Sequence, residues 1–195
     1  VPTIGSDRVP VYCMTEWNST VSHRDWLSDT AWKGAYIAKN ILENYDAVEC
    51  FGYWTCTDLI EEQKMPGELF HGGLGMFTFN RLPKPPYHVF CMLAKLGDTL
   101  IARGDGYFVT KKEGDYIAIL YNYRHYSRLY AQGELFNMTS TNRYTAFPDE
   151  DLLSLHLKFA GLDASSYILS ETYVNKNHGS VFDQWLRMGA MPLDA

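Results

Sequence analysis

Glu16 is the first residue whose position suggests chemistry, because it lies in the sequence "TEWN" directly after an apolar run. That run, residues 11–14, is typical of a buried strand. In αβ-barrels the catalytic groups gather where the strands end, because the loops that follow the strands build the active site. A catalytic carboxylate and a solvated loop glutamate are equally good interpretations of this position alone.

A second group of reactive side chains follows the apolar stretch 47–58. The sequence "YWTCTDLIEE" places Trp54, Asp58, Glu61 and Glu62 at or just beyond the end of that stretch. Paired carboxylates with aromatic platforms suit glycoside hydrolysis, where an oxocarbenium-like transition state needs a negative partner and a proton donor. For Glu61 and Glu62 taken alone, a solvated acidic loop is the more common explanation.

The first hundred residues alternate between strand and helix patterns. The expected order is a strand at 9–15, a helix at 29–45, a strand at 47–58, a long loop at 59–83 and a helix at 85–96. Strands that are apolar on both faces and separated by helices are typical of a parallel sheet covered by helices. This arrangement would bring the ends of the two strands, and the carboxylates that follow them, to one edge.

From about residue 105 the apolar residues recur with period two. A hairpin is expected across Glu113-Gly114, and residues 153–159 alternate strictly between apolar and polar side chains. Strands joined by turns without helices favour an antiparallel β-sandwich, and Ser180 is expected to cap a short final helix. We therefore expect two parts, an α/β region at 1–100 and a β-sandwich at 101–195.

The composition excludes several classes of function. The net charge is −6 and the basic residues do not cluster, which argues against nucleic acid and anionic membrane surfaces as partners. No apolar run reaches the roughly 18 residues of a membrane span. The six histidines form no ligand pair, so no metal is expected. The four cysteines lie in apolar runs and predict buried thiols in a reducing, cytoplasmic compartment.

Several motifs in linked order carry a resemblance to a known family. "PVYCMTEWNST", "YWTCTDLIEE", "FHGGLGM" and "KPPYHVFCMLAKLG" resemble the C-terminal part of a glycoside hydrolase family 39 enzyme of the β-xylosidase type. The likeness continues through "VTKKEGDYIAILYNY" and "HGSVFDQWLRMGAM", so it covers nearly the whole chain. The order of the motifs is specific, although no single motif is.

The resemblance implies a fold and a set of roles. The family has a retaining (β/α)₈ barrel with an attached β-sandwich, and this chain would supply the seventh and eighth strand–helix units and the sandwich. Glu16 would be the nucleophile, and Trp54 with Glu61 or Glu62 would line the sugar subsite. The substrate would be a xylose-containing oligosaccharide, and no cofactor would be needed. Ile60 and Cys56 depart from the family pattern, which has aromatic residues there.

The family's acid/base glutamate lies in an Asn-Glu-Pro motif, and this motif does not occur in the 195 residues. A complete barrel needs about 250 residues, whereas about a hundred precede the expected sandwich. We therefore expect a fragment that is inactive alone and that forms a homo-oligomer through its exposed barrel strands. The alternative is a non-catalytic carbohydrate-binding or interaction module.

Overall fold

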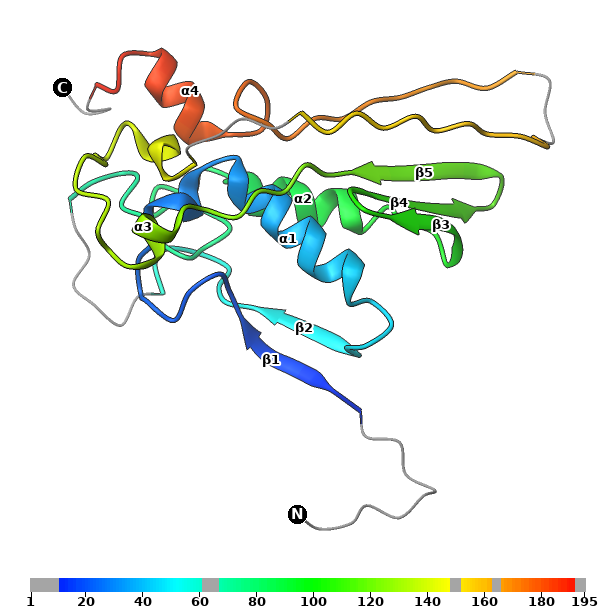
Figure 1. Cartoon of the computed structure of the whole chain (residues 1–195), viewed down its shortest axis with the longest axis horizontal. Helices are drawn as coiled ribbons and strands as arrows, with labels where there is room; N and C mark the ends of the chain where they lie inside the picture. Colours follow the sequence, from blue (N-terminus) through cyan, green and yellow to red (C-terminus); the bar gives the residue numbers. More distant parts are fainter. Residues whose placement is uncertain (1–10, 61–66, 148–151, 163–165, 192–195) are drawn as a thin grey trace, which may run out of the picture.

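The computed structural model describes residues 11–60, 67–147, 152–162 and 166–191 (Figure 1). The first part contains β1 (Cys13–Trp17), the short helix η1 (Trp26–Asp29), α1 (Trp32–Glu43), β2 (Cys50–Tyr53) and α2 (Pro85–Leu93). The second part contains β3 (Thr99–Gly104), β4 (Tyr107–Lys112), β5 (Asp115–Leu120), α3 (Arg128–Ala131), η2 (Arg143–Ala146) and α4 (Val181–Arg187).

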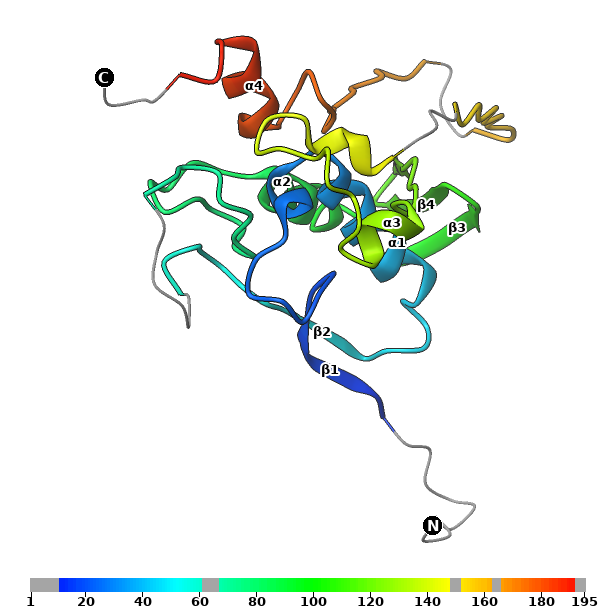
Figure 2. The same ribbon diagram turned by 60° about the vertical axis from the view of Figure 1, so that its left-hand side comes forward.

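The parallel strand pair predicted for the first part is confirmed. β1 pairs in parallel with β2, and Cys13 lies opposite Cys50. The connection contains η1 and α1, with Asp25 capping η1 by accepting a hydrogen bond from the Leu27 amide at 2.9 Å. In both views the pair β1–β2 lies on one side of α1, and α4 lies on the opposite side (Figures 1 and 2).

The hydrophobic core continues from the parallel unit into the second part of the chain. Its buried members come from β1, α1, α2, β4 and the residue after β5: Trp17, Ile37, Ala38, Leu42, Val89, Phe108 and Tyr121. Burying large side chains of this kind stabilises the fold by about 1.5–3 kcal/mol each. The strand that carries Glu16 is therefore anchored in the core by its neighbour Trp17.

The second part contains one antiparallel sheet in the order β3-β4-β5. The hairpin predicted across Glu113 and Gly114 is confirmed, and both turn residues have positive φ, +55° and +130°. Positive φ at two successive residues is typical of a tight hairpin turn. The short final helix is also confirmed, because α4 begins after Ser180, whose hydroxyl accepts from the Asp183 amide at 3.5 Å.

The β-sandwich is not formed within the described residues. Residues 152–160 and 166–174 run extended near β5 without a strand ladder, and the rings of Phe159 and Tyr167 lie 5.6 and 6.4 Å from that of Tyr116. Strict alternation of apolar and polar side chains dictates an extended backbone, whereas a ladder also requires an aligned partner edge. Within the described residues, the parallel pair β1–β2 and the antiparallel sheet β3-β4-β5 are the two sheets, so no second antiparallel sheet is available to pack on β3-β4-β5.

The prediction that the cysteine thiols are buried is wrong. Cys13, Cys50, Cys56 and Cys91 are all exposed. Val11, which precedes β1, is 70% exposed as well. An apolar run indicates that a strand can be covered on both faces, but the described residues cover these strands on the α1 side alone. None of the described helices has the length and apolar character of a membrane span.

Candidate active site at the ends of β1 and β2

Glu16 is the next-to-last residue of β1, and its side chain is exposed. The next residue, Trp17, is buried and stacks on Tyr36 of α1 with ring centroids 5.5 Å apart. Cys13, Met14, Thr15 and Glu16 are all exposed, so Trp17 is the one residue of β1 that is buried against α1.

A β-bulge lies at Glu16. Met14 pairs with Phe51 and Trp17 pairs with Tyr53, so two residues of β1 face the single residue Gly52 of β2. A Cβ atom at Gly52 would lie 2.3 Å from the carbonyl oxygen of Thr15. Bulges re-aim side chains and are common next to active sites. The bulge and the glycine opposite it together set the direction of the Glu16 carboxylate.

Trp54 follows β2 immediately and meets the end of β1. Its amide donates a hydrogen bond to the carbonyl oxygen of Trp17 at 2.9 Å, and its side chain is 37% exposed. The Trp54–Thr55 peptide bond is cis. The structure thus brings Trp54 to the strand end that carries Glu16. Glu61 and Glu62, the other residues predicted for the sugar subsite, lie outside the described residues.

Asn18 connects the two strand ends to a third segment. Its Nδ2 donates to the carbonyl oxygens of Trp54 and, at 3.4 Å, of Leu74. Its Oδ1 accepts from Lys33 Nζ and from the Ser19 amide, the latter at 2.7 Å. Sequence reasoning did not identify Lys33, because lysine in a helix is almost always exposed and nothing in the pattern of α1 marks this one.

A buried ion cluster lies beneath this edge. Lys84 Nζ lies 2.7 Å from Asp29 Oδ1 and 3.2 Å from Asp58 Oδ2, and it donates to the carbonyl oxygen of Gly73 at 2.7 Å. Arg143 donates to Asp29 Oδ2 at 2.6 Å. The cluster joins η1, the segment after β2, the residue before α2 and η2. The sequence pattern marked Asp58, whereas nothing in it marked Lys84 or Arg143.

The two cations of this cluster outweigh the effect of burial at Asp29 but not at Asp58. Burial alone would raise the pKa of Asp29, but Lys84 and Arg143 outweigh it and hold that pKa below its ordinary value. The pKa of Asp58 is raised, first by burial and further by the negative Asp29. Burial would lower the pKa of Lys84, but the two carboxylates outweigh it and raise that pKa. Such mutual neutralisation indicates a structural cluster rather than a proton-transfer site.

The glycines of "FHGGLG" let the backbone pack closely around Asp58. A Cβ atom at Gly73 would lie 2.4 Å from the Asp58 carboxyl carbon, and one at Gly75 would lie 2.4 Å from the Asp58 amide nitrogen. The Gly75 amide donates to Asp58 Oδ1 at 2.7 Å. The motif therefore serves close backbone packing around a buried carboxylate, and it holds the loop that supplies Leu74 to the Asn18 contact.

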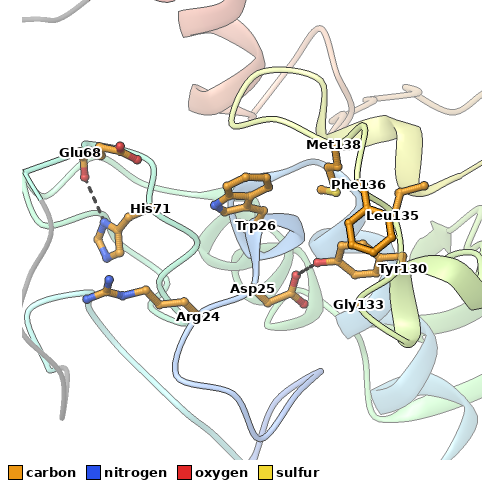
Figure 3. A pocket seen from close by; sticks show the side chains of 10 residues that line it. All are labelled: Arg24, Asp25, Trp26, Glu68, His71, Tyr130, Gly133, Leu135, Phe136 and Met138. Carbon is orange, nitrogen blue, oxygen red and sulfur yellow. Dashed lines mark hydrogen bonds between the residues drawn. The ribbon is translucent and has the colours of Figure 1, made fainter.

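A cavity of about 560 Å³ opens among the loops of this region (Figure 3). Its walls come from three segments and combine charged, aromatic and apolar side chains: Arg24, Asp25, Trp26, Glu68, His71, Tyr130, Gly133, Leu135, Phe136 and Met138. Tyr130 donates its hydroxyl to Asp25 across the floor. Aromatic faces beside charged hydrogen-bonding groups are suited to a sugar. The described residues contain no cluster of three or more potential metal ligands.

Known proteins resemble this chain over most of its length. The chain is 32% identical over 177 residues to a β-xylosidase of Geobacillus stearothermophilus, and this match covers 90% of the chain and 31% of that enzyme. A β-xylosidase of Caldicellulosiruptor saccharolyticus is 42% identical over 89 residues, which cover 45% of the chain and 18% of that enzyme. The chain thus spans less than a third of the length of either relative.

A solved structure and a family model agree with these relatives. A GH39 β-xylosidase from Caulobacter crescentus superposes with a TM-score of 0.54 and 26% sequence identity, over 60% of this chain and 27% of that one. The family model described as glycosyl hydrolases family 39 matches residues 5–193. The solved structures that resemble this chain point to a family that contains a TIM barrel. The chain belongs to glycosyl hydrolases family 39.

Proposed function

We propose that this chain is the nucleophile-bearing part of a longer retaining β-xylosidase that removes terminal xylose from xylo-oligosaccharides. The observation that carries the proposal is the exposed carboxylate of Glu16 at the end of β1, beside Trp54 at the end of β2. In retaining glycosidases a carboxylate attacks the anomeric carbon and forms a covalent glycosyl-enzyme, which water then hydrolyses. Glu16 takes the role of that nucleophile.

The remaining groups that the sequence predicted for the site suit a sugar. The half-exposed indole of Trp54 supplies an apolar wall, and Glu61 or Glu62 holds sugar hydroxyl groups. The cavity lined by Trp26 and Phe136 offers aromatic side chains to further sugar units of the oligosaccharide. No cofactor takes part, because two carboxylates are sufficient for this reaction.

The second carboxylate of the reaction is supplied by the longer protein. A retaining pair lies about 5–5.5 Å apart, and the family's Asn-Glu-Pro motif does not occur in these 195 residues. General acid catalysis contributes typically 10²–10⁴-fold to the rate. The 195-residue chain alone is therefore expected to hydrolyse xylosides far more slowly than the longer protein, since it also lacks the other walls of the sugar site.

The test compares the longer protein with the isolated 195-residue chain on 4-nitrophenyl β-xyloside. The longer protein is expected to turn over at enzymatic rates, with β-xylose as the first product seen by NMR, and the isolated chain is not. Release of α-xylose first would contradict a retaining mechanism. Turnover by the isolated chain that Glu16→Gln abolishes would contradict the need for a second part. Binding of xylo-oligosaccharide by the longer protein without turnover would favour the alternative, a carbohydrate-binding module.

A further inference from the structure

Lys33 is an unusual residue in the first turn of α1. Its side chain is fully buried. Its ammonium group donates to two neutral oxygen atoms, Asn18 Oδ1 and Ser19 Oγ, and lies 5.3 Å from the centre of the Tyr36 ring. Lysine is almost never fully buried unless it is paired with a carboxylate. The ion pairs that the structure describes in this region instead join Lys84 and Arg143 to Asp29.

The burial of this ammonium group carries a cost. Burial is the first cause that lowers the pKa of Lys33, to about 7. An apolar side chain of similar volume often replaces a buried charged group without loss of stability, or with a gain. Stability of the fold therefore does not explain a lysine at this position, and its two hydrogen-bond acceptors near Glu16 indicate another role.

The contact with Asn18 fixes which way that amide faces. Lys33 Nζ donates to Asn18, so the atom of Asn18 that meets it is the acceptor Oδ1. The donor Nδ2 then faces the carbonyl oxygens of Trp54 and Leu74. A reversed amide would place two donors together at Lys33 and two acceptors together at Trp54. Lys33 thus selects the single orientation in which Asn18 joins the two strand ends.

We propose that Lys33 is a positioning residue that holds the Glu16 strand end and the Trp54 strand end in one fixed relation through Asn18. The proposal rests on the proposed function, because the groups that it positions are the nucleophile and the sugar wall. Lys33 itself touches neither sugar nor reacting atoms. A displacement of about 1 Å in such an arrangement can cost about 10²-fold in rate.

The test uses the longer protein and three variants. Lys33→Met removes the donor and keeps an apolar stem of similar length. Asn18→Asp keeps an acceptor for Lys33, and adds an ion pair with it, but removes the donor to Trp54. Lys39→Met is the matched control, because Lys39 lies on the same helix and pairs at the surface with Glu43. Each variant is measured for kcat and KM on 4-nitrophenyl β-xyloside and for thermal unfolding.

Lys33→Met and Asn18→Asp are both expected to lower kcat about 10- to 100-fold with a smaller change in KM, while Lys39→Met matches the wild type. Asn18→Asp is expected to do so without a lower unfolding temperature, since its carboxylate neutralises Lys33. A purely structural role for Asn18 predicts the opposite, a stabilised variant with wild-type kcat. Wild-type kcat in either folded variant would overturn the inference. An inactive wild-type protein would instead overturn the proposed function.

Discussion

The Trp54 amide donates to the carbonyl oxygen of Trp17 at 2.9 Å, and this hydrogen bond joins the end of β2 to the end of β1. Trp17 is buried against α1, so the junction is anchored in the core. Glu16 precedes the acceptor of this bond, and the Trp54 side chain belongs to its donor. The spacing between the proposed nucleophile and the proposed sugar wall is therefore set by backbone atoms rather than by long, flexible side chains.

The bulge at Glu16 gives the first prediction. Gly52→Ala would place a Cβ atom 2.3 Å from the carbonyl oxygen of Thr15, so Thr15 and Glu16 must shift. We expect kcat of the longer protein on 4-nitrophenyl β-xyloside to fall about 10- to 100-fold. Gly67→Ala is the control, because its Cβ atom would meet no heavy atom within 4 Å. Equal kcat values for the two variants would show that the bulge does not orient Glu16.

The buried ion cluster gives the second prediction. Lys84→Met leaves Asp29 paired with Arg143 alone and Asp58 without its cation. Removing one partner of a buried ionic group typically costs about 3–5 kcal/mol, so we expect a loss of this size in the free energy of unfolding, measured by urea denaturation. Lys39→Met removes a surface pair and should leave that free energy almost unchanged. A loss as small as that of the control would contradict a structural role for Lys84.

The pH dependence of stability gives the third prediction. The pKa of Lys33 is about 7 in the folded protein, against 10.5 ordinarily, and the cause is burial, partly opposed by Asp25 and Asp29 and reinforced by Lys84. The unfolded state therefore binds more protons between pH 7 and pH 10, and stability rises with pH in that window. Relative to Lys33→Met, the wild type should gain up to a few kcal/mol from pH 7 to pH 10. A constant difference between the two proteins would contradict the lowered pKa.

The exposed apolar residues in and just before β1 give the fourth prediction. Val11 and Tyr12 are 70% and 63% exposed, and Met14 is 39% exposed. An exposed apolar strand pairs readily with another chain, and each Å² of apolar surface buried contributes about 25 cal/mol. The isolated 195-residue chain should therefore form a homodimer or a larger assembly at micromolar concentration in light scattering. Val11→Lys combined with Tyr12→Lys should shift the assembly toward monomer, and a monomeric wild type would contradict this prediction.

Local pattern was sufficient for much of the fold. The apolar run before Glu16, the helical spacing around Ile37 and the turn at Glu113 each predicted the element that forms there. The alternation at 153–159 predicted a strand of a sandwich, but no ladder forms there, because an extended backbone pairs only beside an aligned partner. The exposure of Cys13 was not predicted either. An apolar run indicates that a strand can be buried, but it does not show which part of the protein buries it.

Only the site residues that lie at the ends of strands could be predicted from the sequence. Glu16 and Trp54 follow apolar runs, so their meeting follows from parallel pairing. Lys33 and Lys84 lie fully buried through contacts with Asn18, Asp29 and Asp58 that are distant in sequence. Nothing in the sequence marks these two lysines as buried, because lysine side chains usually lie at the surface. These polar contacts are set by tertiary packing and not by periodicity.

The role of Glu16 as nucleophile is tested most directly by chemical rescue of Glu16→Ala in the longer protein. Removing the nucleophile prevents formation of the covalent glycosyl-enzyme, so hydrolysis of 4-nitrophenyl β-xyloside should almost cease. Azide can enter the vacated space and attack the anomeric carbon from that face. If Glu16 is the nucleophile, azide should restore the release of nitrophenol and give α-xylosyl azide as the product. Near-wild-type activity without azide, or rescue that gives only β-xylosyl azide, would contradict this role.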